Sequence, residues 1–368
     1  MPTGTGAQNQ RNLPGSATPY TINPSLFNSL TQKQDFNPQN FSFPSPSNYT
    51  NTVLRQVGII SKIRLLVEGA LVLSAAAQIT PTYKWPYGII KNVQLSGNQM
   101  NNFISVTGND LYLRQILQNR AYVDNITVPG VGSSGTAVAG TYPFTIQFEV
   151  PIAMDMTSLT GSLYAQTEAT NLTLQLTAEA IANLFTGAGV ADLTITNTAG
   201  TAGTTPNVLV EETIFSIPYN PSKAGELVLP DLTVLHGFIA NDVPVAAQAT
   251  VTTNLYRTNA DLYRLFYLTD NGNVLVPTSE YVQTQLMYGA SEVPYQYNPV
   301  LFQKLGNNVD ARLSFPDGEY CFDFAAENPG RDKVILEGVT NLRLITQYSG
   351  VAWNSAAYVH TVQETLFA

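Results

Sequence analysis

The sequence predicts an all-β protein built from two antiparallel β-sandwiches, with few short helices. Strand-like runs bounded by turn residues recur from residue 53 to residue 348. Only two stretches, 107–122 and 299–305, combine a polar start with apolar residues near helical spacing. The chain of 368 residues is long enough for two β domains of ordinary size. Many short strands without strand–helix alternation favour antiparallel sandwiches over a parallel sheet.

The segment 144–150 shows the alternation expected of a half-buried strand. Phe144, Ile146 and Phe148 point to one side, whereas Thr145 and Gln147 point to the other. Other strand-like runs are 59–67, 71–74, 89–95, 172–176 and 209–217 in the first half, and 227–229, 233–239, 249–255, 261–268, 274–276, 318–324, 334–336 and 342–348 in the second. No sequence repeat relates the two halves, so any duplication would lie in the fold alone.

Proline-rich segments divide the chain into three parts. The Pro-bracketed segment 218–221 separates the two runs of strands. We therefore expect a first sandwich over 51–218 and a second sandwich, with a C-terminal tail, over 219–368. Residues 1–50 form a separate N-terminal extension.

The N-terminal extension, residues 1–50, is predicted to be an extended arm. It has seven prolines and only three charged residues, so it cannot build a core of its own. A disordered leader is the alternative, but the extension carries more spaced aromatic residues than a linker needs. The candidate anchors that would bind a neighbouring subunit are Tyr20, Phe27, Phe36, Phe41 and Phe43.

The low charge of the chain suggests self-association. Charged residues make up 12% of the chain, about half the usual ~25%. A surface with so few charges favours burial against copies of the same protein. The net charge of −9 and the 17 scattered basic residues argue against specific nucleic-acid binding.

Motifs for catalysis, cofactors or metals are weak, so we predict no catalytic, cofactor or metal site and no enzyme. The Gly-rich segment 130–135 has dinucleotide-loop spacing, but no helix follows it to receive a phosphate. His236 and His360 lie far apart in the sequence, and Cys321 is the only cysteine. Carboxylates such as Glu212 and Asp317 leave a glycosidase-like pair open. Asp270-Asn271-Gly272 is better explained as a tight hairpin turn.

The sequence also predicts a soluble protein made in the cytosol. The first 20 residues lack the apolar segment of a signal peptide. The longest apolar stretch, 65–77, is interrupted by Glu68 and Gly69 and is too short to span a bilayer.

Several short motifs resemble those of tectivirus major capsid proteins, and their order along the chain agrees with that family. In the first half they are Phe148-Glu149-Val150-Pro151-Ile152-Ala153, Ser158-Leu159-Thr160-Gly161 and Leu172-Thr173-Leu174-Gln175-Leu176. In the second half they are Leu262-Tyr263-Arg264, Asp270-Asn271-Gly272 and Phe315-Pro316-Asp317-Gly318-Glu319-Tyr320-Cys321. No single motif is diagnostic, and the collinearity across both halves carries the resemblance.

This resemblance implies two eight-stranded jelly rolls side by side. Three copies would form a pseudo-hexagonal capsomer of an icosahedral virus shell, a bacteriophage virion assembled in the host cytoplasm. Its implied partners are neighbouring capsomers, minor capsid and vertex proteins, and an internal membrane on the inner face. Residues 1–50 lack a basic amphipathic helix, which argues against direct membrane binding by the arm. The alternative function is a carbohydrate- or receptor-binding β-sandwich of a phage or bacterium.

Overall fold

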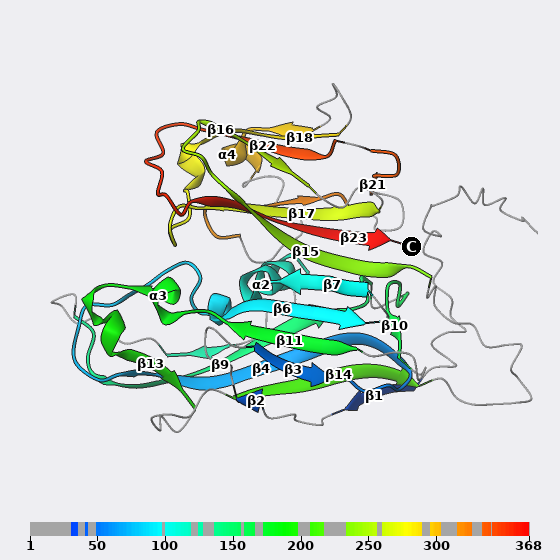
Figure 1. Ribbon diagram of the computed structural model, residues 1–368, viewed down its shortest axis with the longest axis horizontal. Coiled ribbons are helices and arrows are strands. Elements are labelled where there is room, and N and C mark those ends of the chain that lie inside the picture. Colours follow the sequence, from blue (N-terminus) through cyan, green and yellow to red (C-terminus); the bar gives the residue numbers. More distant parts are fainter. Residues whose placement is uncertain are drawn as a thin grey trace, which may run out of the picture.

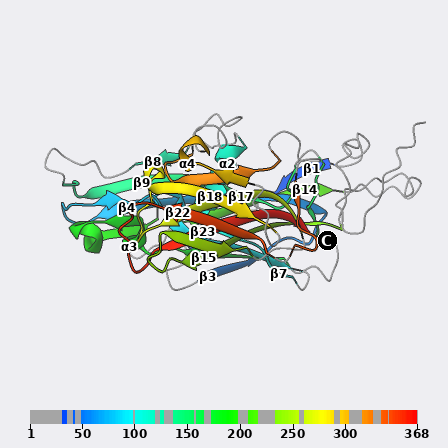
Figure 2. The ribbon, with the colours of Figure 1, turned by 90° about the horizontal axis from the view of Figure 1, so that it is seen from above.

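The computed structural model shows two β-sandwiches stacked on each other (Figure 1). The residues it describes are 31–35, 41–42, 49–97, 100–118, 124–127, 136–155, 158–165, 172–197, 207–216, 233–255, 260–288, 295–302, 315–325, 333–339 and 341–367. Seen from above, the strands of both sandwiches run mainly along the long axis of the molecule (Figure 2).

The first sandwich consists of two facing sheets. One has the strand order β1 (Thr31–Asp35), β14 (Asn207–Ser216), β4 (Ile59–Leu73), β9 (Gly140–Pro151) and β8 (Asn125–Ile126). The short strands β2 (Phe41–Ser42), β10 (Leu163–Tyr164) and β13 (Leu193–Thr196) pair along its sides. The facing sheet has the order β3 (Tyr49–Val53), β11 (Thr173–Ala178), β6 (Ile90–Gly97) and β7 (Met100–Val106).

The second sandwich is built in the same way. One sheet has the order β15 (Leu235–Pro244), β23 (Tyr358–Phe367), β17 (Asp261–Asp270) and β20 (Glu319–Asp323), and β21 (Val334–Ile335) also pairs with β17. The facing sheet has the order β16 (Thr250–Asn254), β22 (Arg343–Tyr348), β18 (Tyr281–Met287) and β19 (Tyr295–Tyr297).

Both sandwiches share one strand topology. If the eight main strands of each are counted along the chain, one sheet has the order 1-8-3-6 and the other has the order 2-7-4-5. This double-sheet arrangement is a jelly roll. The prediction of two eight-stranded jelly rolls is confirmed, and the duplication is one of fold without a visible sequence repeat.

The two jelly rolls are joined through a continuous sheet. The fifth strand of the first roll, β7, pairs in parallel with the first strand of the second roll, β15. The register places Phe238 beside Ile104 and Ile239 beside Ser105. Figure 1 shows these strands next to each other, with α2 lying against the second roll.

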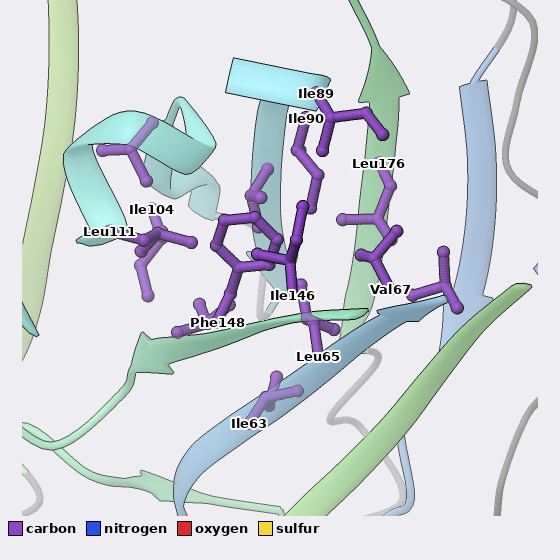
Figure 3. Close-up of a cluster of buried hydrophobic side chains, with 14 of the residues drawn as sticks. Ile63, Leu65, Val67, Ile89, Ile90, Ile104, Leu111, Ile146, Phe148 and Leu176 are labelled. Carbon is purple, nitrogen blue, oxygen red and sulfur yellow. The ribbon is translucent and has the colours of Figure 1, made fainter. Parts of the chain in front are cut away.

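Each roll has its own core, and the first core reaches into the second roll. Figure 3 shows buried side chains of β4 and β9, including Ile63, Leu65 and Phe148, packed against those of the facing sheet. The core of the second roll contains Tyr267 and Tyr320, whose rings stack at 4.8 Å. The residues of the second roll that join the first core are Phe238, Ala260, Phe266, Phe315, Cys321, Val362 and Phe367.

A helix follows the fifth strand of each roll. These are α2 (Gly108–Leu117) after β7 and α4 (Pro299–Leu301) after β19, which lie within the two predicted helical stretches. Thr107 and Asn298 cap their first turns with side-chain hydrogen bonds. The remaining elements are α3 (Ile181–Leu184), β5 (Thr80–Pro81), β12 (Phe185–Thr186), and the 3₁₀ turns Tyr87–Ile89, Ala188–Asp192 and Thr278–Glu280.

Two expectations about the chain ends are corrected. Residues Thr31–Asp35 were assigned to the arm, but they form β1 and pair with β14 as the first strand of the first roll. The expected C-terminal tail contains β23, a strand that lies between β15 and β17. The boundary predicted at residue 218 falls in 217–232, which lies outside the described residues.

Candidate functional site: the joint between the two jelly rolls

The carboxylates considered as a catalytic pair do not belong to one site. Glu212 lies on β14 of the first roll, where its carboxylate faces the backbone N–H of Arg55 at 3.4 Å. Asp317 lies in the turn before β20 of the second roll and accepts a hydrogen bond from Thr278 N. Among the described residues, no group of His, Cys, Asp or Glu is placed to hold a metal ion. The Gly-rich segment 130–135 lies outside the described residues.

The predicted turn at Asp270-Asn271-Gly272 is confirmed. Gly272 and Asn273 have φ values of 74° and 69°, the left-handed region that a tight hairpin turn requires. Asn271 N donates to Val274 O, and Asp270 Oδ1 accepts from Asn273 N. The carboxylate of Asp270 therefore stabilises the turn.

Several buried charged residues meet at the joint between the rolls. Helix α2 brings three of them from the first roll: Asn109, Asp110 and Arg114. The capping box at the start of α2 fixes one of these, because Thr107 N donates to Asp110 Oδ2 and Asp110 N donates to Thr107 Oγ1. All three side chains bind the sheet of the second roll that contains β23.

Glu364 on β23 is the centre of the first cluster. Its fully buried carboxylate accepts hydrogen bonds from Arg114 Nε at 2.8 Å and from Arg264 Nη1 at 2.9 Å, and it lies 3.1 Å from His236 Nε2. Burial alone would raise the pKa of Glu364, but the two guanidinium groups and His236 hold it well below its usual range. The other ring nitrogen of His236 contacts the carbonyl oxygen of Pro151 in the first roll.

The first roll approaches His236 through a loop that needs glycine. Gly161 has a φ of +80°, and a Cβ atom there would lie 2.8 Å from the Cβ of His236. Gly161 ends the Ser-Leu-Thr-Gly motif on which the sequence resemblance partly rests. In this structure the motif therefore forms part of the joint.

His360, also on β23, is the centre of the second cluster. Its Nε2 lies 2.9 Å from Asp110 Oδ1 of the first roll, and its Nδ1 lies 2.5 Å from Asp242 Oδ1 on β15. Burial alone would lower the pKa of His360, but the two aspartates raise it well above the ordinary value. The imidazole of His360 therefore bridges the two rolls, and both aspartates favour its protonated form.

Glu319 on β20 adds a carboxyl group with an unusual pKa. The residue is buried, and burial raises its pKa to about 7 although Asn109 Nδ2 donates to its Oε1 at 3.0 Å. The nearby Asp110 raises the pKa further, and His360 lowers it. Glu319 is thus the joint residue whose charge changes near neutral pH.

A third cluster surrounds Asp270. Its Oδ2 accepts hydrogen bonds from the hydroxyl groups of Tyr83 and Tyr358 and lies 2.9 Å from Lys84 Nζ. Burial and the neighbouring acidic groups raise the pKa of both tyrosines. Because Tyr83 and Lys84 belong to the first roll, this cluster is another bond between the rolls.

A cavity of about 480 Å³ lies at the joint, between the second and third clusters. Its wall includes Lys84, Asp110, Asp270 and His360, which are paired with one another or with neighbours in ion pairs. The joint is chemically suited to fix the two rolls in one relative position, because separating them would expose several ion pairs that are matched only across the contact.

The sequence analysis did not find this joint. It treated His236 and His360 as distant residues, but β15 and β23 are adjacent strands and both histidines bond to residues of the first roll. Glu364 lies in the expected tail. His360, Val362, Glu364 and Leu366 share the face of β23 that lies against the first roll, but their mixed polarity gives no strand signal in the sequence.

Of the five candidate arm anchors, the structure describes only Phe41. Tyr20, Phe27, Phe36 and Phe43 are outside the described residues. Phe41 begins β2 and pairs with Val208 of β14. Over the part of the chain that is described, no helix has the length and apolar character needed to cross a membrane.

Comparison with known proteins identifies the fold. No protein-family model and no curated protein sequence matches the chain. Among solved structures, the major capsid protein (MCP) of Sulfolobus turreted icosahedral virus aligns with a TM-score of 0.67 and 14% identity, over 92% of this chain and 97% of that chain. The Faustovirus major capsid protein aligns with a TM-score of 0.58 and 10% identity, over 92% of this chain and 90% of that chain.

The major capsid protein P2 of bacteriophage PM2 also aligns, with a TM-score of 0.50 and 11% identity over 92% of this chain and 98% of that one. These proteins share the double jelly roll and are structural components of virus shells. The predicted double jelly-roll fold is therefore confirmed.

Proposed function

We propose that this chain, which has the fold of viral double jelly-roll major capsid proteins, is itself the major capsid protein of an icosahedral virus. The observation that carries the proposal is the joint. Two rolls of identical topology are locked together by a shared sheet and by the buried carboxylate of Glu364, which binds arginines from both rolls. A protein that moved its domains to act on a ligand would not bury such contacts between them.

The capsomer we propose is a homotrimer. One chain supplies two equivalent rolls in a fixed relation, so three chains supply six, and six similar units can occupy a pseudo-hexagonal outline. Such an assembly needs large contacts between subunits, on the order of 2,000 Å² or more. The low content of charged residues, 12%, favours burial of this extent.

The wider assembly follows from the same proposal. Neighbouring capsomers, minor capsid and vertex proteins would contact the rim of the trimer, and an internal membrane would lie beneath its inner face. We propose that the segment before β1 clamps neighbouring capsomers, with Tyr20 and Phe27 as its anchors. Particles would assemble in the host cytoplasm, and the protein would have no enzymatic activity.

Sedimentation and negative-stain microscopy test the proposal directly. We expect a mass three times that of the 39.9 kDa chain and a particle with a hexagonal outline. Monomers at micromolar concentration that bind glycans would instead support the receptor-binding alternative. Glycan hydrolysis that is lost in Glu212→Gln or Asp317→Asn would overturn the structural role.

A further inference from the structure

The outward face of the second roll carries a row of charges at the joint. Arg264 on β17 is in register with Glu364 on β23 and with Asp323 on β20. Its guanidinium lies 2.9 Å from Glu364 Oε2 and 3.1 Å from Asp323 Oδ1. We call these three residues the second-roll row. Helix α2 of the first roll covers it and adds Arg114.

The first roll has the same row at the corresponding strands. Arg64 on β4, the third strand, is in register with Glu211 on β14, the eighth strand, and with Glu149 on β9, the sixth strand. Arg64 Nη1 lies 3.6 Å from Glu211 Oε2. We call these three residues the first-roll row. Its arginine side chain is 34% exposed, compared with 12% for Arg264.

The correspondence continues to the next outward pair. Two residues after Arg264, Phe266 is in register with Val362, and both belong to the core shared with the first roll. Two residues after Arg64, Leu66 is in register with Leu209, and both are only partly buried. The first roll thus repeats the charged row and the outward pair. Arg64 and Glu211 are more exposed than Arg264 and Glu364, whereas Glu149 is buried and pairs with Lys62 Nζ at 3.1 Å.

The element that would bind such a face is also repeated. Helix α4 follows the fifth strand of the second roll as α2 follows the fifth strand of the first. Counted from their caps, Asn109 and Asp110 of α2 correspond to Val300 and Leu301 of α4. The first two bind the second roll, whereas Val300 and Leu301 are 38% and 58% exposed. The next residue is buried in each case: Leu111 in the first roll and Phe302 in the second.

We propose that β19 and α4 of one copy dock on the outward face of the first roll of a second copy, at the first-roll row and at Leu66 and Leu209. The contact between copies would therefore repeat the contact within the chain. Within the chain, a fifth strand, β7, pairs with a first strand, β15. In the described part of the chain, the other fifth strand, β19, pairs only with β18, and the other first strand, β1, pairs only with β14.

The proposal rests on the capsomer proposed above and specifies its subunit interface. The contact is head-to-tail, because a surface of the second roll meets a different surface of the next first roll. Such heterologous contacts close into rings when the rotation allows. With one contact geometry used both within and between chains, three copies would give six similar joints around a ring.

The charge pattern supports the polarity of the contact. In the covered row, Glu364 Oε1 accepts from Arg114 of the other roll. In the open row, the equivalent Glu211 Oε1 is buried and makes no hydrogen bond within the described chain. The apolar residues presented by α4 match the neighbouring leucine pair, so that docking would bury both the pair and the row.

Two surface substitutions test the donor side. Leu301→Asp should weaken trimer association by about 100-fold in sedimentation experiments, since central apolar anchors dominate interfaces of this kind. The matched control is Val274→Asp, because Val274 is 62% exposed and lies in the hairpin after β17 and not on α4. Circular dichroism should show both variants folded, because both side chains are exposed.

Cysteine cross-linking tests the pairing itself. The only native cysteine, Cys321, is buried, so introduced thiols react without competition. Leu301 corresponds to Asp110, which contacts His360, and the counterpart of His360 by register in the first roll is Asn207. The double variant Leu301→Cys, Asn207→Cys should therefore give covalent trimers on oxidation, whereas Val274→Cys, Asn207→Cys should not. Helix α4 and strand β14 lie at opposite ends of the molecule in Figure 1, so a link within one chain is ruled out.

The outcomes separate this inference from the proposed function. A wild-type monomer would remove the capsomer and the interface together. A wild-type trimer that persists unchanged in Leu301→Asp, together with no cross-link between cysteines at 301 and 207, would retain the capsomer and overturn this interface. Loss of the trimer in Val274→Asp would also overturn it, because the contact would then lie elsewhere.

Discussion

The two jelly rolls carry the same acid–arginine–acid row in different surroundings. In the second roll, Glu364 is fully buried and α2 completes its partners; in the first roll, Glu211 and Arg64 keep exposed fractions of 17% and 34%. A covered row holds two rolls together, because its charges are matched only in the assembled state. The open row is available for the same purpose between subunits.

Neutralising the two rows should give the largest difference between the rolls. Glu364→Gln leaves the buried Arg114 and Arg264 without their anion and should cost about 3–5 kcal/mol of unfolding free energy. Glu211→Gln alters a partly exposed pair and should cost less than about 1 kcal/mol. Urea unfolding of both variants at low protein concentration gives the comparison. Equal losses of unfolding free energy in the two variants would show that covering by α2 does not strengthen the second-roll row.

The first strands of the rolls differ in a similar way. Within the described residues, β15 has a neighbouring strand on both sides, whereas β1 has one only on the side of β14. Deleting residues 1–30 should leave the unfolding free energy unchanged. Deleting residues 1–43 removes β1 and β2 and their pairing with β14, with a loss of a few kcal/mol at about 1 kcal/mol per hydrogen bond. The melting temperatures of the two truncations provide the measurement. Similar melting temperatures would mean that β1 contributes little to the first roll.

The sequence analysis failed to predict two strands, β1 at the start of the first roll and β23 at the end of the second. Thr31–Asp35 reads Thr-Gln-Lys-Gln-Asp, and nothing in its side chains distinguishes an edge strand from a polar arm. β23 has buried residues along nearly its whole length, including Glu364, Thr365 and His360. Strand patterns are recognised by alternation of polar and apolar residues. A strand with ion pairs on one face and threonines on the other does not show it.

The features that the sequence did predict depend on local rules. The turn at Gly272, the two helical stretches with polar starts, and the alternation of Phe144, Ile146 and Phe148 each involve neighbours within a few residues. The joint does not. His360 meets Asp110 across 250 residues of sequence, and a single sequence contains no information about which distant charges will meet.

The pH dependence of stability should belong to the second roll, because Glu319 has Thr145 as its counterpart by register in the first. The pKa of Glu319 is raised from 4.5 to about 7 by burial. Its stabilisation is full below pH 4.5, where the carboxyl group is protonated in both states. It is lost as pH rises to about 7, by on the order of 3 kcal/mol at most. His360, with its raised pKa, acts in the same direction at higher pH.

Glu319→Gln isolates the effect of this one carboxyl group. The amide stays neutral and retains an acceptor for Asn109 Nδ2. We expect the variant to match the wild type at pH 4.5 and to be more stable than it at pH 8. Thermal unfolding at both pH values is the measurement, with Thr145→Val as a control that should leave the pH profile unchanged. A Glu319→Gln profile that parallels the wild type would assign the pH dependence to other groups.

The smallest expected difference lies in the two helix caps, and it separates stability from assembly. Thr107→Ala removes a capping box that also orients Asp110 toward His360, so it should lower the unfolding free energy of the monomer by about 1–2 kcal/mol. Asn298→Ala removes hydrogen bonds to the N–H groups of Val300 and Leu301 on an exposed turn. Its cost to the unfolding free energy of the monomer should be about 1 kcal/mol or less.

The two variants should have the opposite order of effect on assembly. Because α4 would then hold its apolar residues less firmly, Asn298→Ala should weaken trimer association more than Thr107→Ala does. The reverse order in sedimentation would place the subunit contact away from α4.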